Sequence, residues 1–170
     1  MTDTSFATLI DKVTTITEEE CHLVPDDWMQ GRTVYGGLLV AMVLRSMNRH
    51  VPQERKVRSL LFSFIGPLKA EPFFIKTQIL RSGKSVTTIE AKVIQNDVIC
   101  SNALGSFGAD RDSKILITPM KKLEIKDTSK AIKLPYIEGL TPAFTRHFDY
   151  RWAIGDYLFL EKAVMKLEAG

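Results

Sequence analysis

The stretch that decides the fold begins as a glycine-containing loop and continues as an apolar helix. It reads Met29-Gln30-Gly31-Arg32-Thr33-Val34-Tyr35-Gly36-Gly37-Leu38-Leu39-Val40-Ala41-Met42-Val43-Leu44. After the glycine pair, apolar residues fall on every side of a helix, which is the pattern of a helix buried all round. We expect this helix to run from Gly36 to about Arg49, because basic residues fill its last turns and Pro52 follows.

The glycine pair at the helix start is open to two interpretations. Glycine lets another group approach the backbone closely, and a helix N-terminus presents unpaired N–H donors with positive dipole character. Gly36 and Gly37 are therefore candidate donors to the oxyanion that forms when a carbonyl is attacked. The alternative is that they only permit tight packing of the helix start against its neighbours.

Length and composition describe an ordinary globular chain. Its 170 residues make about one domain with some chain left over, and 45% of them are hydrophobic and 25% charged. A net charge of +3 does not indicate a nucleic-acid partner. Cys21 and Cys100 lack metal or redox spacing, and His22, His50 and His147 are scattered, so we predict no metal site. With neither an export-signal layout nor a membrane-length apolar run, the chain is expected to be cytoplasmic and not bound to a membrane.

Alternating polar and apolar residues predict four strands after the helix. They are expected at 57–65, 73–80, 86–95 and 98–108, with tight turns at Ser82-Gly83 and Asn96-Asp97. One-sided alternation with tight turns indicates an antiparallel sheet with one buried face. The one strongly apolar helix, at Gly36, is the partner for that face. The predicted fold is α+β: a curved antiparallel sheet wrapped around one long central helix, known as the hotdog fold.

The rest of the chain divides around this domain. Residues 13–23 are expected to be extended, because they are rich in β-branched side chains. The Pro-containing, non-periodic residues 111–142 are interpreted as a linker. Aromatic residues return from Phe144, but too few residues follow for a second core. We therefore expect a hotdog domain at 1–110, a linker at 111–142, and a partial second repeat or docking and dimerisation segment at 143–170.

Several short motifs occur in a fixed order between about residues 20 and 110. They are Gly31-Arg32-Thr33-Val34-Tyr35-Gly36-Gly37, Val51-Pro52-Gln53-Glu54-Arg55-Lys56-Val57-Arg58-Ser59, Phe62-Ser63-Phe64 before Gly66-Pro67, Leu80-Arg81-Ser82-Gly83-Lys84-Ser85 and Ile94-Gln95-Asn96. In this order they resemble the N-terminal half of the acyl-CoA thioesterase II family. Members of that family are double hotdogs, and the segment from Phe144 resembles the opening strand of the second repeat.

The resemblance implies hydrolysis of an acyl-CoA to a fatty acid and CoA. It implies no cofactor, since CoA is part of the substrate. In the family, the carboxylate, amide and hydroxyl that handle the attacking water come from the second repeat, so no catalytic residue is carried over. The first repeat offers no obvious replacement, because no acidic residue lies between Asp27 and Glu54.

Each of the other candidate site residues has a possible functional role and an ordinary structural role as the alternative. Gln30 is a pocket candidate that would orient water or substrate, or a solvated loop residue. Tyr35 is a hydrogen-bonding wall of the pocket, or a half-buried structural side chain. Arg81, Lys84 and Ser85 flank a hairpin and suit CoA phosphates, or simply keep the hairpin soluble.

These observations lead to three hypotheses about function and one about the oligomeric state. The first is a thioesterase whose site is completed by a partner copy or by further sequence. The second is a non-catalytic acyl-CoA-binding or structural hotdog protein that lacks the base. The third, a hydratase, is disfavoured because an acid–base pair is missing near the helix. Since a single hotdog exposes a sheet edge and an apolar face, we expect a homodimer or higher homo-oligomer.

Overall fold

The computed structural model describes residues 4–11, 19–115, 117, 125 and 127–154. The chain forms two compact units. One consists of Met1–Ile115 with Tyr136–Phe148, and the other of Leu116–Pro135 with Asp149–Gly170. This division differs from the boundaries expected at 110 and 142, because residues 136–148 pack with the hotdog domain.

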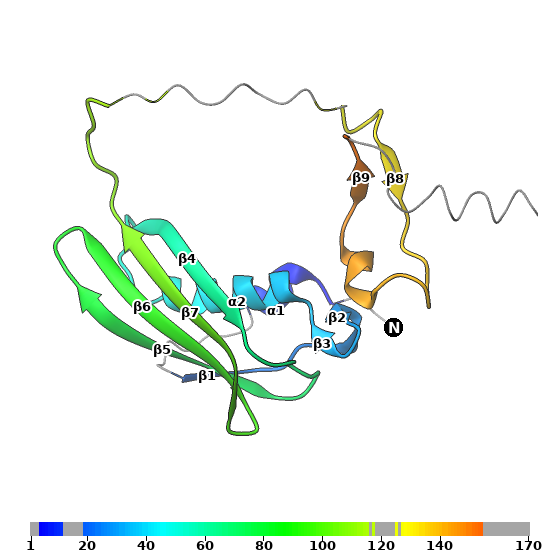
Figure 1. Ribbon diagram of the computed structural model, residues 1–170, viewed down its shortest axis with the longest axis horizontal. Helices are drawn as coiled ribbons and strands as arrows, with labels where there is room; N and C mark the ends of the chain where they lie inside the picture. The colour runs from blue at the N-terminus through cyan, green and yellow to red at the C-terminus, as the bar shows by residue number, and fades with distance from the viewer. Residues whose placement is uncertain (1–3, 12–18, 116, 118–124, 126, 155–170) are drawn as a thin grey trace, which may run out of the picture. The chain divides into compact units, whose positions relative to one another are not determined.

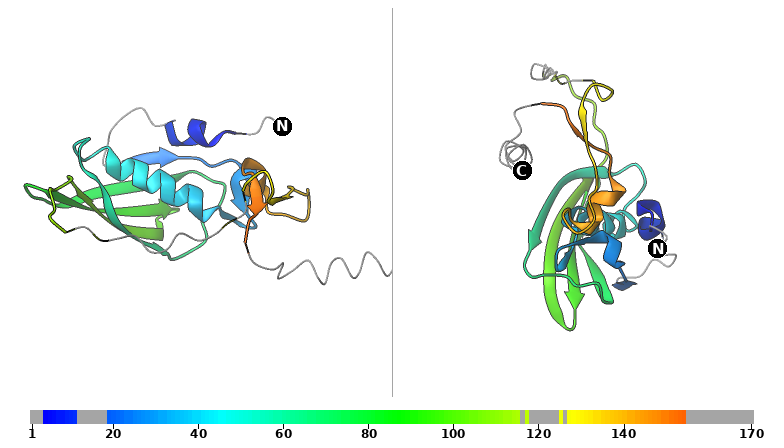
Figure 2. Two further views of the ribbon diagram at one scale, coloured as in Figure 1. Left: turned by 90° about the horizontal axis from the view of Figure 1, so that it is seen from above. Right: turned by 90° about the vertical axis from the view of Figure 1, so that its right-hand side faces the viewer.

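The larger unit is a five-stranded antiparallel sheet with one long helix against it. Its elements are α1 (Phe6–Asp11), β1 (Glu19–His22), the 3-10 helix η1 (Asp26–Trp28), β2 (Met29–Gln30), β3 (Thr33–Val34), α2 (Gly36–Asn48), β4 (Lys56–Phe64), β5 (Phe73–Ser82), β6 (Val86–Gln95), β7 (Val98–Gly108) and the 3-10 helix η2 (Ala143–His147). The strand order is β1-β5-β6-β7-β4, while β2 and β3 form a separate pair. Helix α2 lies along one face of the sheet (Figure 1), and the sheet curves around it (Figure 2). The predicted helix, the four strands and their arrangement are confirmed.

The core lies between α2 and the inner face of the sheet. Alternate residues of β6, from Thr87 to Gln95, are buried, and the intervening ones are more exposed. The largest fully buried side chains are Trp28, Phe73, Phe107, Leu38, Met47, Leu68, Ile75, Ile89, Val24, Val43, Val93 and Thr87. Period-two burial along the strands is what the sequence pattern predicts. The prediction that α2 is buried all round is wrong. Its buried residues form one stripe, and Val40, Ala41 and Leu44 are only partly buried, because the sheet packs against one side of the helix.

The tight turn and the first strand were both expected from the sequence. Asn96 and Asp97 both have positive φ, at 51° and 60°, which is the backbone of the predicted tight turn. The extended segment expected at 13–23 is seen as β1 from Glu19 to His22, and residues 13–18 lie outside the described part of the chain.

A buried polar cluster ties β1 to the C-terminal half of α2. Glu20 is 3% exposed; it accepts a hydrogen bond from Ser46 Oγ at 2.7 Å and pairs with Arg49 at 3.0 Å. His22 Nε2 lies 3.4 Å from the same carboxylate. Burial lowers the pKa of His22, and the nearby Glu20 charge opposes this only in part. The cluster lies at the opposite end of α2 from the glycine pair.

The segment from Phe144, expected to open as a strand, begins instead as η2. Phe144 and His147 stand three residues apart on η2, which places their rings on one side, and Phe148 follows in an extended conformation. In the second unit, β8 (Ile132–Leu134) pairs with β9 (Tyr150–Trp152). The strand that was expected to begin at Phe144 therefore begins at Tyr150, as β9. None of the described helices is long and apolar enough to cross a bilayer.

Candidate functional site

A cavity of about 560 Å³ lies at the mouth of α2, by which we mean its first turn, from Tyr35 to Leu38. Its lining residues are Gln30, Thr33, Val34, Gly36, Phe64, Ile65, Gly66 and Pro67. They come from the β2–β3 pair, the helix start, and the end of β4 with the turn that follows. The wall from β4 is mainly apolar, whereas Gln30 and Thr33 bring polar side chains beside the helix N-terminus.

Backbone hydrogen bonds fix the frame of this mouth cavity. Tyr35 N donates to Trp28 O at 3.0 Å, and Val34 N donates to Leu68 O at 2.8 Å. In return, Leu68 N donates to Thr33 Oγ1 at 3.0 Å. The two bonds to Leu68 join the chain before α2 to the chain after β4, and the bond from Tyr35 to Trp28 holds the chain before α2 together.

The two glycines of the mouth have different neighbours. A Cβ added at Gly36 would lie 3.0 Å from Phe64 Cζ, so the Phe64 ring packs over Gly36 from the edge strand β4. A Cβ added at Gly37 would lie 2.5 Å from the hydroxyl oxygen of Tyr35. Gly36 lines the cavity, whereas the Tyr35 ring packs directly against Gly37. Close packing therefore accounts for a glycine at both positions, and it leaves the cavity on the Gly36 side.

The structure brings some predicted site residues together and separates others. Gln30 and Gly36 line the same cavity. Tyr35 is the residue before the first helical position, is partly buried, and stacks on Phe144 with ring centroids 4.0 Å apart. Its role as a wall of the pocket stays a prediction.

The predicted phosphate-binding hairpin lies at the other end of the sheet. Arg81 lies near the end of β5, and Lys84 and Ser85 lie in the turn between β5 and β6, near the start of β4. Arg55 holds that turn by donating to Gly83 O at 3.0 Å and to Lys84 O at 3.1 Å. The mouth cavity lies by the end of β4. Within a single chain, these hairpin residues therefore do not lie beside Gln30 and Gly36.

Sequence reasoning missed two contributors to this region. From the sequence, Phe64 is placed in a strand and in a family motif but not in the site, although the Gly66-Pro67 turn after it marks where that strand ends beside the mouth. The aromatic residues of η2 also pack beside the mouth; their three-residue spacing indicates a helical turn but not the ring on which it docks.

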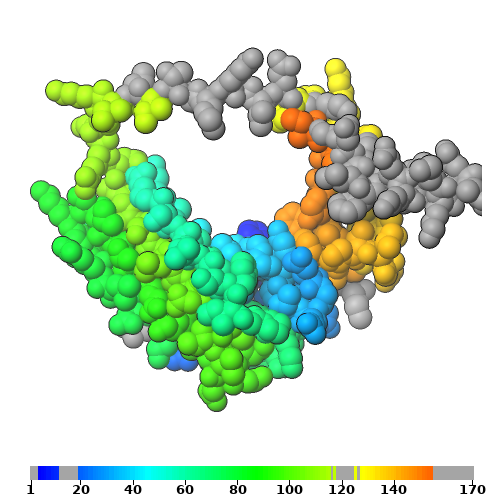
Figure 3. Space-filling model, in the orientation of Figure 1, coloured from blue at the N-terminus to red at the C-terminus, as the bar shows by residue number. Residues whose placement is uncertain are grey.

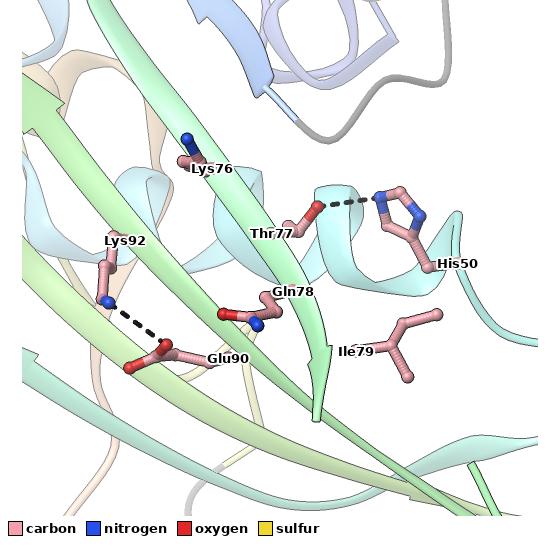
Figure 4. Close-up of a pocket in the computed structure, with 7 residues that line it drawn as sticks. All are labelled: His50, Lys76, Thr77, Gln78, Ile79, Glu90 and Lys92. Carbon is pink, nitrogen blue, oxygen red and sulfur yellow. Dashed lines mark hydrogen bonds and ion pairs between the residues drawn. The ribbon is translucent and has the colours of Figure 1, made fainter. Parts of the chain in front are cut away.

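A second cavity, of about 500 Å³, lies where β5 extends past its last described pairing with β1, at Lys76. Its lining residues are His50, Lys76, Thr77, Gln78, Ile79, Glu90 and Lys92 (Figure 4). Thr77 Oγ1 and His50 Nε2 are 2.9 Å apart, and Lys92 pairs with Glu90 at 3.3 Å. A hydrogen bond from Asn102 lowers the pKa of Glu90. Because these charges are paired with each other, the cavity is a weaker candidate than the mouth.

No group of three His, Cys, Asp or Glu residues in the described part of the chain is placed to hold a metal ion. The absence of a cofactor stays a prediction. The features that define a candidate site are therefore a helix mouth, two polar side chains and an apolar wall.

A curved antiparallel sheet around a central helix, with a cavity at the helix mouth, defines the hotdog class of proteins. A family model for the acyl-CoA thioesterase N-terminal domain matches residues 24–108. The chain belongs to this family. A comparison with curated protein sequences gives no significant match.

Solved structures with the same fold include longer thioesterase II proteins. A provisionally assigned thioesterase II from Thermobifida fusca YX has a TM-score of 0.73 at 16% identity, over 86% of this chain and 53% of that one. A hot dog fold protein of unknown function from Alicyclobacillus acidocaldarius has a TM-score of 0.72 at 17% identity, over 84% and 53%. The acyl-CoA thioesterase II TesB2 from Mycobacterium marinum has a TM-score of 0.61 at 18% identity, over 75% and 47%. The chain thus spans about half the length of these proteins.

Proposed function

We propose that the protein binds an acyl-CoA at the mouth of α2 and takes part in hydrolysis of its thioester to a carboxylic acid and CoA. The observation that carries the proposal is the mouth cavity itself, which sets a helix N-terminus beside Gln30 and Thr33 and an apolar wall. Membership of the acyl-CoA thioesterase family supports the same substrate class. In this proposal the thioester carbonyl points at Gly36, and the acyl chain lies along Phe64 and Ile65.

Gly36 would supply the stabilisation of the oxyanion. It is the first residue of α2, and the first N–H groups of a helix have no acceptor within the helix. When water attacks the thioester carbon, the carbonyl oxygen becomes an oxyanion, and one well-placed donor lowers that barrier by about 3 kcal/mol. The tetrahedral intermediate then collapses with loss of the CoA thiolate, which takes up a proton to give the thiol.

The base that activates the water would come from a second hotdog unit. None of the described residues that line the mouth cavity carries a carboxylate or an imidazole. We propose that a second copy of this chain, or further sequence, covers the free edge of β4. Its exposed side chains support this contact: Leu61, Phe64 and Ile65 are 66%, 61% and 61% exposed.

The hairpin residues Arg81, Lys84 and Ser85 are proposed to contact CoA phosphates. They lie at the opposite end of α2 from Gly36, and the phosphates are likewise far from the thioester along the CoA arm. The free thiols of Cys21 and Cys100 support a proposed place in the reducing cytoplasm. The proposed substrate class, an acyl-CoA, supports a proposed role in fatty acid metabolism.

A second candidate function is binding of acyl-CoA without hydrolysis. The missing carboxylate in the mouth cavity favours it. Thiol release from acyl-CoAs of short to long chain length distinguishes the two functions, and calorimetry with the same ligands shows whether binding occurs. Saturable release supports the thioesterase, and binding without release supports the alternative. If no acyl-CoA binds, both are refuted. Light scattering at micromolar concentration tests the dimer, which a monodisperse monomer would contradict.

A further inference from the structure

The residues that return to the hotdog domain after the linker form an aromatic clasp at the helix mouth. The clasp is defined here as Phe144, His147 and Phe148 packed on Trp28 and Tyr35. Phe144 stacks on Tyr35 with centroids 4.0 Å apart and planes 6° from parallel. His147 stacks on Trp28 at 4.1 Å and 3°. Phe148 meets both Trp28 and Tyr35 edge-on, at 6.0 and 5.7 Å. Figure 3 shows the orange residues of this segment against the blue ones around the mouth.

Hydrogen bonds and burial hold the clasp in place. His147 Nε2 lies 3.1 Å from Asp27 O and 3.2 Å from Asp27 Oδ2. Trp28 Nε1 donates to Thr4 O at 2.8 Å, so the ring under His147 is itself fixed. Phe144 is only 7% exposed. Flat rings in offset or edge contact gain about 0.5–1.5 kcal/mol per pair beyond their buried area, so three such rings make a firm attachment.

The clasp acts on the mouth through Tyr35. The Tyr35 ring sits so close to Gly37 that a methyl group there would overlap its hydroxyl oxygen and ring carbons, at 2.5–2.6 Å. Phe144 packs on the same ring. The Tyr35 ring thus packs against Gly37, which stays exposed to solvent, and the cavity lies on the Gly36 side.

We propose that Phe144 is a positioning residue that keeps the Tyr35 ring packed against Gly37 and so fixes the shape of the mouth beside Gly36. The ligand-binding consequence rests on the proposed function: a thioester carbonyl then meets one backbone N–H in one orientation. Without the stack, the Tyr35 ring leaves Gly37, the mouth beside Gly36 loses its fixed shape, and the carbonyl loses its fixed direction.

The test compares Phe144→Leu, which keeps an apolar side chain but removes the ring, with Phe144→Tyr, which keeps the ring. Phe74→Leu is the matched control, because Phe74 is a 41% exposed ring on the outer face of β5. The first readout is the amide NMR signal of Gly37 in protein labelled with 15N-glycine. The second is calorimetry with a non-hydrolysable acyl-CoA thioether.

We expect Phe144→Leu to shift the Gly37 signal and to weaken binding of the thioether about 2- to 10-fold, the range of one lost aromatic pair. Phe144→Tyr should restore both, and Phe74→Leu should change neither. An unmoved Gly37 signal in Phe144→Leu overturns the proposal, because Tyr35 is then seated without the clasp. A moved signal with unchanged affinity also overturns it, since the clasp is then only structural. If the unmodified chain binds no acyl-CoA ligand, the proposed function fails, and the Gly37 signal alone decides whether Phe144 seats Tyr35.

Discussion

The substitution Gly37→Ala tests whether the second glycine of the mouth is a packing position. The added Cβ would lie 2.5 Å from Tyr35 Oη and 2.6 Å from two ring carbons, well inside van der Waals contact. Either the helix start or the Tyr35 ring must move, and overpacking of this kind costs about 1–3 kcal/mol. Alanine offsets this by up to about 1 kcal/mol through its higher helix propensity. We therefore expect the free energy of unfolding to fall by about 1–2 kcal/mol.

Urea unfolding followed by circular dichroism measures this loss, and a double-mutant cycle with Tyr35→Ala assigns it. On the Tyr35→Ala background the obstructing ring is gone, so Gly37→Ala should be neutral or slightly stabilising. Gly66→Ala is the matched control, because a Cβ there has no atom within 4 Å. Equal costs of Gly37→Ala on both backgrounds would refute the reasoning, since the coupling between Gly37 and Tyr35 would then be zero.

Three further predictions concern the buried cluster and the hairpin. Glu20→Gln removes the buried charge that pairs with Arg49 and should lower the free energy of unfolding by about 3 kcal/mol; a loss near zero in urea unfolding would contradict this. Because burial lowers the pKa of His22, the unfolded chain takes up that proton first, and stability should fall as pH drops below about 6.5. Urea unfolding of His22→Phe at pH 7.5 and 5.5 should show a smaller fall than the unmodified chain, and an equal fall would refute the assignment. Replacing Arg81 and Lys84 by serine should weaken CoA binding about tenfold and reduce its salt dependence, and calorimetry at two ionic strengths would disprove the phosphate contact if neither changes.

Local patterns predicted the elements of the hotdog domain because each element has its own periodicity. The buried alternation of β6 and the apolar run from Gly36 to Leu44 are local signals, so both elements were predictable. The position of η2 was not predictable from the sequence. A 3-10 turn that docks through Phe144 depends on a partner ring at Tyr35, far away in the sequence, and no local spacing encodes that pair.

The candidate site was predictable only where it is local. The loop and helix start from Gln30 to Gly36 are contiguous in sequence, so their closeness follows from the chain itself. Phe64 reaches the same cavity through the pairing of β4 with β7, which sets where β4 ends relative to α2. The interpretation of Gly36 and Gly37 as equivalent donors left out their different neighbours, which are the Phe64 ring at Gly36 and the Tyr35 ring at Gly37.

Gly36→Pro compared with Gly36→Ala tests the central claim most directly. Both substitutions add a Cβ, but only proline removes the N–H. Proline is tolerated at the first helical position, and Tyr35 has a ψ of 121°, which suits a residue before proline. With thiol release from an acyl-CoA as the assay, the account predicts that the proline variant turns over about 100- to 1,000-fold more slowly than the alanine variant. Equal rates would contradict a thioester carbonyl bound at Gly36.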